Sequence, residues 1–332
     1  MLYHTLGNTG IQASAIGLGT WNIANQWGRI EEEDAIATVH SAIDCGINII
    51  DTAESYGMPA GLSEERVGRA LSGNKRQKVH IVTKMGRWGR RSGQMVPMTT
   101  TDMVRLCAHA SLYRLRTDYI DVMLCHEGKL ADEAMADTYL AGFELLKEQG
   151  CIGAYGISTD RLEVLKLFNK NSTCQVVEVD YSLLSRNPDK EFLPYCQENG
   201  IAVLMRGTLH KGLLSGKYSG QTVFTDTVRS EWYKDEKSKQ KLARKLAKVE
   251  QLRSILHPGK EMVTAALRFA ISHPIKPVAI AGAKSPEQVA INASAGDQLL
   301  PAEQRETLIR HTKLKDKKPT NKKPTDKELA IA

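Results

Sequence analysis

The chain has 332 residues, of which 42% are hydrophobic and 25% are charged, an ordinary globular composition long enough to form a core without disulfides. No apolar run approaches the roughly 18 residues that would span a bilayer, and the first residues lack the basic and apolar pattern of a signal peptide. The six cysteines are far apart and form no C-x-x-C pair, so we expect a reducing, cytoplasmic location and no membrane partner.

The net charge of +7 is concentrated near the end of the sequence. Residues 313–332 hold seven lysines and three acidic residues, together with two prolines. We expect a Lys-rich disordered tail over 313–332, following a single barrel domain over 1–312. No aromatic residue is interleaved with these lysines, so nucleic acid is not an expected partner.

Eight short apolar runs alternate with amphipathic segments along the chain. The runs predict strands, and the segments, with apolar residues at helical spacing, predict helices. The predicted strands are 15–20, 47–51, 79–84, 119–126, 152–158, 175–181, 201–206 and 276–281. The predicted helices are 31–44, 64–71, 99–116, 133–148, 159–169, 188–199, 237–256, 261–272 and one that begins at Ser285-Pro286.

Local signals define several of these ends. Ser63 is a typical N-cap residue for the helix that starts at Glu64. Gly200 is placed to end the helix over 188–199, and proline at the first helical position follows Ser285.

Eight strand–helix units in about 300 residues favour a closed (β/α)8 barrel over a doubly wound open sheet. The open sheet would gain support from a G-x-G-x-x-G motif, but Gly17-Leu-Gly19 is followed by Thr20-Trp21. A hairpin over Tyr3–Ile11 would lie outside the repeat and could plug one end of the barrel. The long irregular stretch over Tyr218–Glu236 is typical of a functional loop.

Polar side chains end successive strands, where the chemistry of such barrels gathers. The second strand delivers Asp51 and then Tyr56, the third ends at Lys84, and the fourth ends at His126. Each alone could be a solvated charge, a loop aromatic or a core histidine. Together they predict one pocket, in which an ammonium group lowers the pKa of a phenol so that the phenol can protonate a carbonyl oxygen.

We expect Asp51 to hold Lys84, and His126 to orient the substrate oxygen. Gly57 allows the loop behind the phenol to turn tightly. No ligand set resembles a metal site, so an organic hydride donor is the better partner.

Together these residues resemble the aldo-keto reductase superfamily along nearly the whole chain. The resemblance rests on DTAESYG at 51–57, LSEERVGRAL at 62–71, SLYRLRTDYID at 111–121 and KGLLSGK at 211–217. It implies a TIM barrel and reduction of an aldehyde or ketone, which could be sugar-derived. It also implies that NADPH/NADP+ is the cofactor, that Asp51, Tyr56, Lys84 and His126 form the catalytic tetrad, and that Tyr56 is the proton donor.

The resemblance also implies a cofactor site. Lys284 suits a 2′-phosphate, and the helix that begins after Ser285 offers backbone N–H groups to an anion. By themselves the same residues could be a capped surface helix. The expected cofactor residues are Thr20, Trp21, Ser158, Thr159, Glu178, Arg206, Gly207, Leu209, Gly212, Leu213, Ser215, Lys217, Gly282, Lys284, Ser285, Gln288 and Asn292.

Three positions around the nicotinamide depart from the family pattern. Ser158-Thr159 replaces a Ser-Asn pair, Glu178 replaces a glutamine, and Arg206 replaces an aromatic residue. Pairing with Arg206 is one way to neutralise the charge of Glu178, and we expect a Glu178→Gln variant to bind NADPH at least as well.

The expected substrate residues are Trp21, Tyr56, Trp88 and His126, and the expected partner is a small carbonyl compound. Arg87, Arg90 and Arg91, which flank Trp88, could attract anionic substrates. Two alternative functions stay open: a lyase that uses Lys84 as a Schiff-base nucleophile, and a cofactor-bound regulatory subunit with slow turnover.

Overall fold

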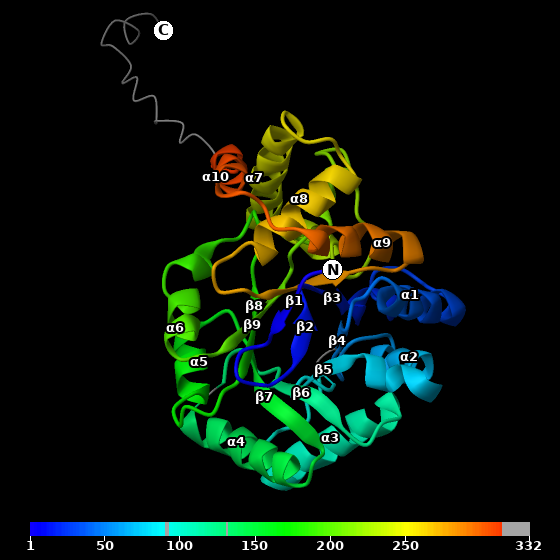
Figure 1. Cartoon of the computed structure of the whole chain (residues 1–332), viewed down its shortest axis with the longest axis vertical. Coiled ribbons are helices and arrows are strands. Elements are labelled where there is room, and N and C mark those ends of the chain that lie inside the picture. The colour runs from blue at the N-terminus through cyan, green and yellow to red at the C-terminus, as the bar shows by residue number, and fades with distance from the viewer. Residues whose placement is uncertain (90–92, 131, 314–332) are drawn as a thin grey trace, which may run out of the picture.

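The structure is a computed structural model that describes residues 1–89, 93–130 and 132–313. Eight parallel strands close into a barrel in the order β10-β3-β4-β5-β6-β7-β8-β9, surrounded by helices (Figure 1). The strands are β3 (Ile16–Gly19), β4 (Ile49–Asp51), β5 (His80–Met85), β6 (Ile120–Cys125), β7 (Ile152–Ser158), β8 (Val176–Asp180), β9 (Ala202–Arg206) and β10 (Val278–Gly282). The predicted (β/α)8 barrel is confirmed, and every predicted strand overlaps an observed one.

A two-stranded hairpin precedes the barrel, as the sequence predicts. Strand β1 (Tyr3–Thr5) pairs antiparallel with β2 (Gln12–Ser14), and in Figure 1 the pair lies across the barrel. The Ser14 backbone N–H donates to Asn48 Oδ1, just before β4, at 2.7 Å. The hairpin residues Leu6 and Ala13 belong to the apolar cluster inside the barrel, so the hairpin closes the amino-terminal end.

The helices cover the outside of the barrel and bury their apolar stripes against it. They are α1 (Glu32–Asp44), α2 (Leu62–Ala70), α3 (Thr101–Leu115), α4 (Glu133–Glu148), α5 (Leu162–Phe168), α6 (Phe192–Glu198), α7 (Glu236–Arg253), α8 (Lys260–Ile271), α9 (Pro286–Ser294) and α10 (Ala302–His311). Helix α10 was not among the predicted helices. The predicted helix over 188–199 is split into a short 3-10 turn and α6.

The end signals are confirmed at two helices and wrong at one. Gly200 has φ of 64° just after α6, and Ser285 Oγ accepts the Gln288 N–H at the start of α9. The prediction that Ser63 caps α2 is wrong, because Gly61, with φ of 87°, precedes the helix and Ser63 lies within it. The Ser63 hydroxyl instead bonds to Thr20 Oγ1 at 2.7 Å, which ties α2 to the end of β3.

The long loop predicted over 218–236 contains one 3-10 turn, Ser230–Tyr233. It is fastened across the barrel mouth, since Thr227 Oγ1 donates to the Gln26 carbonyl at 2.9 Å. Apart from Lys313, the tail predicted over 313–332 lies outside the described residues, and so do Arg90 and Arg91. Within the described ranges, no helix is long and apolar enough to cross a membrane, and all six cysteines are free thiols.

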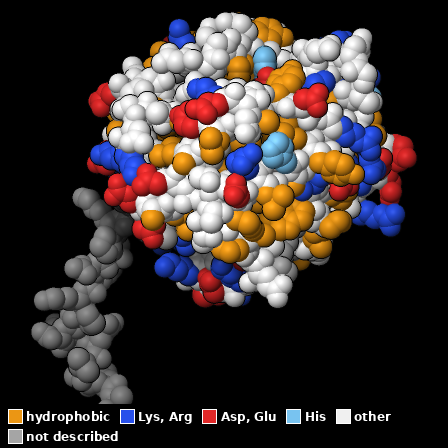
Figure 2. All heavy atoms as spheres, turned by 90° about the horizontal axis from the view of Figure 1, so that it is seen from below, with side chains coloured by type: hydrophobic (Ala, Val, Ile, Leu, Met, Phe, Trp, Pro, Cys, Tyr) orange, Lys and Arg blue, Asp and Glu red, His pale blue; other side chains and the backbone are white. Residues whose placement is uncertain are grey.

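Figure 2 looks onto the side of the molecule that carries α3 and α4 in Figure 1. Hydrophobic side chains gather there among charged ones (Figure 2). Helix α3 exposes Leu106 and Tyr113, and α4 exposes part of Leu145. This surface is on the outer helical layer, away from the strand ends that carry the predicted chemistry.

Candidate active site

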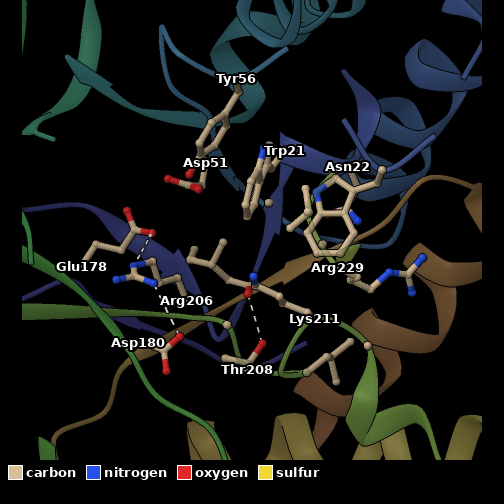
Figure 3. A pocket seen from close by; sticks show the side chains of 18 of the residues that line it. Trp21, Asn22, Asp51, Tyr56, Glu178, Asp180, Arg206, Thr208, Lys211 and Arg229 are labelled. Atoms are coloured by element: carbon tan, nitrogen blue, oxygen red, sulfur yellow. Dashed lines mark hydrogen bonds and ion pairs between the residues drawn. The ribbon is translucent and has the colours of Figure 1, made fainter. Parts of the chain in front are cut away.

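A cavity of about 1560 Å³ opens at the carboxyl-terminal ends of the strands. It exceeds the several hundred Å³ of a usual small-molecule site. Strand ends from around the barrel contribute to its wall, including Asp51, Ser158, Asp180, Arg206 and Gly282, and Glu178 lines it from the middle of β8. Figure 3 shows Asp51 and Glu178 directed into this space from different strands, with Tyr56 beside Asp51.

Lys84 lies beneath the cavity floor, with a fully buried side chain. Its ammonium group donates to Asp51 Oδ1 and, at 3.0 Å, to the Thr52 carbonyl. Its Nζ is also 3.0 Å from Glu178 Oε2. The predicted Asp51–Lys84 pair is therefore present, and a second carboxylate contacts the same ammonium group.

Tyr56 faces this cluster from the loop after β4. Its ring centroid is 5.1 Å from Lys84 Nζ, 5.7 Å from the stacked ring of Trp21 and 6.0 Å from the ring of His126. The three strand-end groups and the phenol that the sequence singled out thus meet at one point.

The ionisation of Tyr56 differs from the expectation. Burial raises the pKa of Tyr56 to about 12, and the opposing effect of Lys84 is smaller than this burial effect. The carboxylates of Asp51 and Glu178 add to the increase, because they disfavour a phenolate. Lys84 acts in the predicted direction, but the prediction that the phenol becomes more acidic overall is wrong.

Two carboxylates share the Lys84 ammonium group, and their ionisation reflects this. Burial and the neighbouring Glu178 raise the pKa of Asp51 above its usual range, against the effect of Lys84. Burial alone would lower the pKa of Lys84, but Asp51 and Glu178 outweigh it and raise that pKa. Lys84 is therefore held as an ammonium ion.

The turn that carries Tyr56 is built by residues outside the predicted tetrad. Gln26 Oε1 accepts both the Trp21 indole N–H, at 2.6 Å, and the Gly57 backbone N–H, at 2.7 Å. Gly57 has φ of 126°, and a Cβ there would lie 2.5 Å from the Pro59 carbonyl oxygen. Gly57 is thus required by the turn, as predicted, while sequence reasoning missed Gln26.

Glu178 and Arg206 each have a partner that lies closer than the other. Arg206 Nε is 4.0 Å from Glu178 Oε1, whereas Arg206 Nη2 donates to both carboxylate oxygens of Asp160, at 2.7 and 2.6 Å. The Glu178–Arg206 pair is therefore present at the limit of ion-pair distance, and Lys84, at 3.0 Å from Glu178 Oε2, is the closer cation. Asp160, two residues beyond the end of β7, was missed, although its place after a strand end was a usable signal.

Most of the predicted cofactor residues line the cavity. They are Trp21, Ser158, Thr159, Glu178, Arg206, Gly207, Leu209, Gly212, Ser215, Lys217, Gly282, Lys284, Gln288 and Asn292. Thr20, Leu213 and Ser285 are not among the lining residues: Thr20 donates to the Asp51 carbonyl, Leu213 is buried in the core and Ser285 caps α9. The Thr159 hydroxyl donates to the Gly128 carbonyl at 3.0 Å.

The predicted substrate residues Trp21, Tyr56, Trp88 and His126 all line the cavity. The mouth also contains Arg87, Trp27 and Arg229. Arg229 comes from the loop over 218–236, and its guanidinium carbon is 5.6 Å from the Trp27 ring centroid. Further lining residues that the sequence did not single out include Asn22, Thr208, Lys211, Lys260 and Ile291.

The cavity is chemically suited to an anionic dinucleotide. Lys211, Lys217, Lys260 and Lys284 supply positive charge along one part of its wall. Near Lys284, α9 begins with a capped turn at Ser285. No group of three or more His, Cys, Asp or Glu side chains that could hold a metal ion occurs within residues 1–89, 93–130 and 132–313.

A closed parallel barrel with a cavity-lining tyrosine beside a buried lysine, aspartate and histidine at its carboxyl-terminal mouth defines the class: a TIM-barrel oxidoreductase. The sequence profile described as "Aldo/keto reductase family" matches residues 15–313. The chain therefore belongs to the aldo/keto reductase family.

Individual relatives agree with this assignment. "Aldo-keto reductase YhdN" of Bacillus subtilis (strain 168) is 32% identical, over 94% of this chain and 95% of the relative. "NADH-specific methylglyoxal reductase" of Escherichia coli (strain K12) is 30% identical, over 92% of this chain and 98% of the relative. A solved aldo-keto reductase from Klebsiella pneumoniae in complex with NADPH has a TM-score of 0.69 and 26% identity, covering 93% of this chain and 95% of that chain.

Proposed function

We propose that this protein reduces an aldehyde or ketone to an alcohol with NADPH, with Tyr56 as the proton donor. A sugar-derived carbonyl compound is included in this substrate class. The observation that carries the proposal is the contact between a cavity-facing phenol and a buried Lys84–Asp51 pair. The six free thiols are compatible with a reducing, cytoplasmic setting.

Bound reduced cofactor would supply a hydride to the carbonyl carbon. Tyr56 donates its hydroxyl proton to the carbonyl oxygen, and the Lys84 ammonium group stabilises the phenolate that remains. Asp51 and the Thr52 carbonyl hold that ammonium group in place. Because the pKa of Tyr56 is raised to about 12, the phenol is protonated at neutral pH and suits the acid role.

His126 and two tryptophans would position the substrate. The His126 ring stands edge-on to Tyr56, with 78° between the ring planes. Trp21 stacks on the same phenol, and Trp88 lines the mouth. A carbonyl oxygen bound between the phenol and the imidazole would be able to accept a hydrogen bond from each.

The lyase alternative fits the cluster less well. A Schiff-base lysine must reach its substrate as a neutral amine. Lys84 is fully buried, does not line the cavity, and has its pKa raised by two carboxylates. These features suit a fixed cation.

The test is a panel of aldehydes and ketones with NADPH oxidation followed by absorbance. Wild-type protein is expected to reduce members of the panel, and Tyr56→Phe is expected to lose 100-fold or more of kcat, on the order of a general acid's contribution. Full activity in Tyr56→Phe would overturn the role of Tyr56. Cofactor binding without turnover of any carbonyl would favour the regulatory-subunit alternative.

Lys284 provides the test of cofactor preference. The relatives include one described as NADH-specific and a structure that holds NADPH. We propose that the Lys284 ammonium group binds the 2′-phosphate, so Lys284→Ala should weaken NADPH binding about tenfold and leave NADH binding unchanged. Lys313→Ala, which removes a charge that is not part of the cavity wall, is the matched control. Equal weakening of both cofactors by Lys284→Ala would contradict the assignment.

A further inference from the structure

The Lys84 ammonium group has two carboxylate partners, and the second one has no part in the proposed proton donation. Glu178 projects from β8, and its side chain is 1% exposed. Its Oε2 is 3.0 Å from Lys84 Nζ, and Asp51 contacts the same nitrogen from β4. An ammonium group that is shared between two carboxylates stabilises the phenolate form of a neighbouring tyrosine less than an unshared one would.

Glu178 is also poorly compensated for so buried a carboxylate. Neither of its oxygens accepts a hydrogen bond of good geometry from the described residues, and the Arg206 Nε is 4.0 Å away. Arg206 instead has Asp160 and, at 3.5 Å, Asp180 as partners. The negative charge of Glu178 is therefore directed mainly at Lys84 and the space in front of it.

The charged or titratable groups that face Tyr56 come from five parts of the barrel. They are Asp51 on β4, Lys84 on β5, His126 after β6, Glu178 on β8 and Arg206 on β9. Of these, Glu178 alone adds negative charge without being the holding partner of Lys84 in the proposed mechanism.

We propose that Glu178 is a positioning residue that acts through Lys84: it draws the ammonium charge away from Tyr56 and keeps the phenol protonated up to a higher pH, which sets the pH range in which each direction of the reaction proceeds. This inference rests on the proposed function. Reduction requires the phenol and oxidation requires the phenolate, so a group that disfavours the phenolate moves the pH profiles of both directions to higher pH.

The test uses Glu178→Gln, which removes the charge and keeps the shape. The pH midpoints of kcat/KM are measured for carbonyl reduction and for alcohol oxidation. Loss of the Glu178 charge should move both midpoints to lower pH by about one unit, a tenfold change in the ionisation constant. These midpoints report on Tyr56 together with the neighbouring Asp51.

Two further variants separate charge from structure. Glu178→Asp keeps the charge and should leave the midpoints closer to the wild-type values. Asp180→Asn removes a carboxylate from the same strand that contacts Arg206 but not Lys84, and it should not move them. An unshifted profile in Glu178→Gln, or an equal shift in Asp180→Asn, would overturn the inference.

A readout without turnover covers the case in which activity is too low to measure. The ultraviolet phenolate signal of Tyr56 is obtained as the difference between a protein and its Tyr56→Phe counterpart, titrated with pH. The Glu178→Gln background should show this signal at lower pH than the wild-type background, and coincident titrations would refute the inference. If Tyr56→Phe retained full activity, the proposed function would fail, whereas the titration would still report on Glu178.

Discussion

Removal of the Lys84 ammonium group should destabilise the fold as well as abolish catalysis. The side chain is fully buried, and the two carboxylates it contacts are 4% and 1% exposed. In Lys84→Met these carboxylates lose their shared cation, and Arg206, at 4.0 Å from Glu178, is the remaining nearby positive charge.

The expected loss follows from the cost of a broken buried ion pair. Removing one partner of such a pair typically costs about 3–5 kcal/mol. Because this variant leaves two buried carboxylates without their cation, we expect a loss at the upper end, about 5 kcal/mol. The free energy of unfolding is measured in urea from the fluorescence of the four tryptophans. A triple variant, Lys84→Met with Asp51→Asn and Glu178→Gln, removes all three charges and should recover most of the loss.

The destabilisation should also depend on pH. Without the ammonium group, the main effect that opposes burial at Asp51 is lost, so the folded-state pKa of Asp51 rises further above its unfolded value. Folding stability from such groups is present below the unfolded pKa and is lost as pH rises through the folded pKa. Lys84→Met should therefore lose less stability near about pH 5 than near about pH 8. A loss below about 1 kcal/mol, or a loss independent of pH, would refute the reasoning.

Three further predictions concern groups outside the tetrad. The imidazole of His80 and the guanidinium of Arg76 outweigh burial and hold the pKa of Asp121 below its ordinary 3.8. Asp121→Asn should therefore lower the free energy of unfolding in urea by about 2–3 kcal/mol at neutral pH. The gap in stability between the wild type and this variant should narrow as pH falls below about 3.8. A Cβ at Gly156 would lie 1.6 Å from a backbone oxygen of β8, so Gly156→Ala should lower the free energy of unfolding by about 3 kcal/mol, whereas Gly220→Ala, with open space around it, should be neutral. Burial raises the pKa of Glu54 from 4.5 to about 7, so the stability of the wild type should fall as pH rises through this interval. Glu54→Gln can still accept the same backbone N–H bonds but cannot ionise. Its free energy of unfolding in urea should therefore lack this part of the fall. An identical pH dependence in that variant would show that Glu54 does not titrate in this range.

The sequence by itself determined the barrel and the residues at its strand ends. Apolar runs such as Ile152–Ser158 are local patterns, and eight of them alternating with helical stripes favour a (β/α)8 barrel over an open sheet. Because parallel strands deliver their last residues to one face, Asp51, Lys84 and His126 could be assigned to a common pocket without any coordinates.

Only the tertiary structure decided which of these groups touch. Barrel closure brings the side chains of Lys84 on β5 and Glu178 on β8 within ion-pair distance of each other. It also places Arg206 closest to Asp160. It also buries Tyr56 deeply enough that desolvation outweighs the nearby ammonium group. Spacing along the chain determines which face a side chain occupies, whereas distances across the barrel and the loss of water depend on how all eight strands pack together.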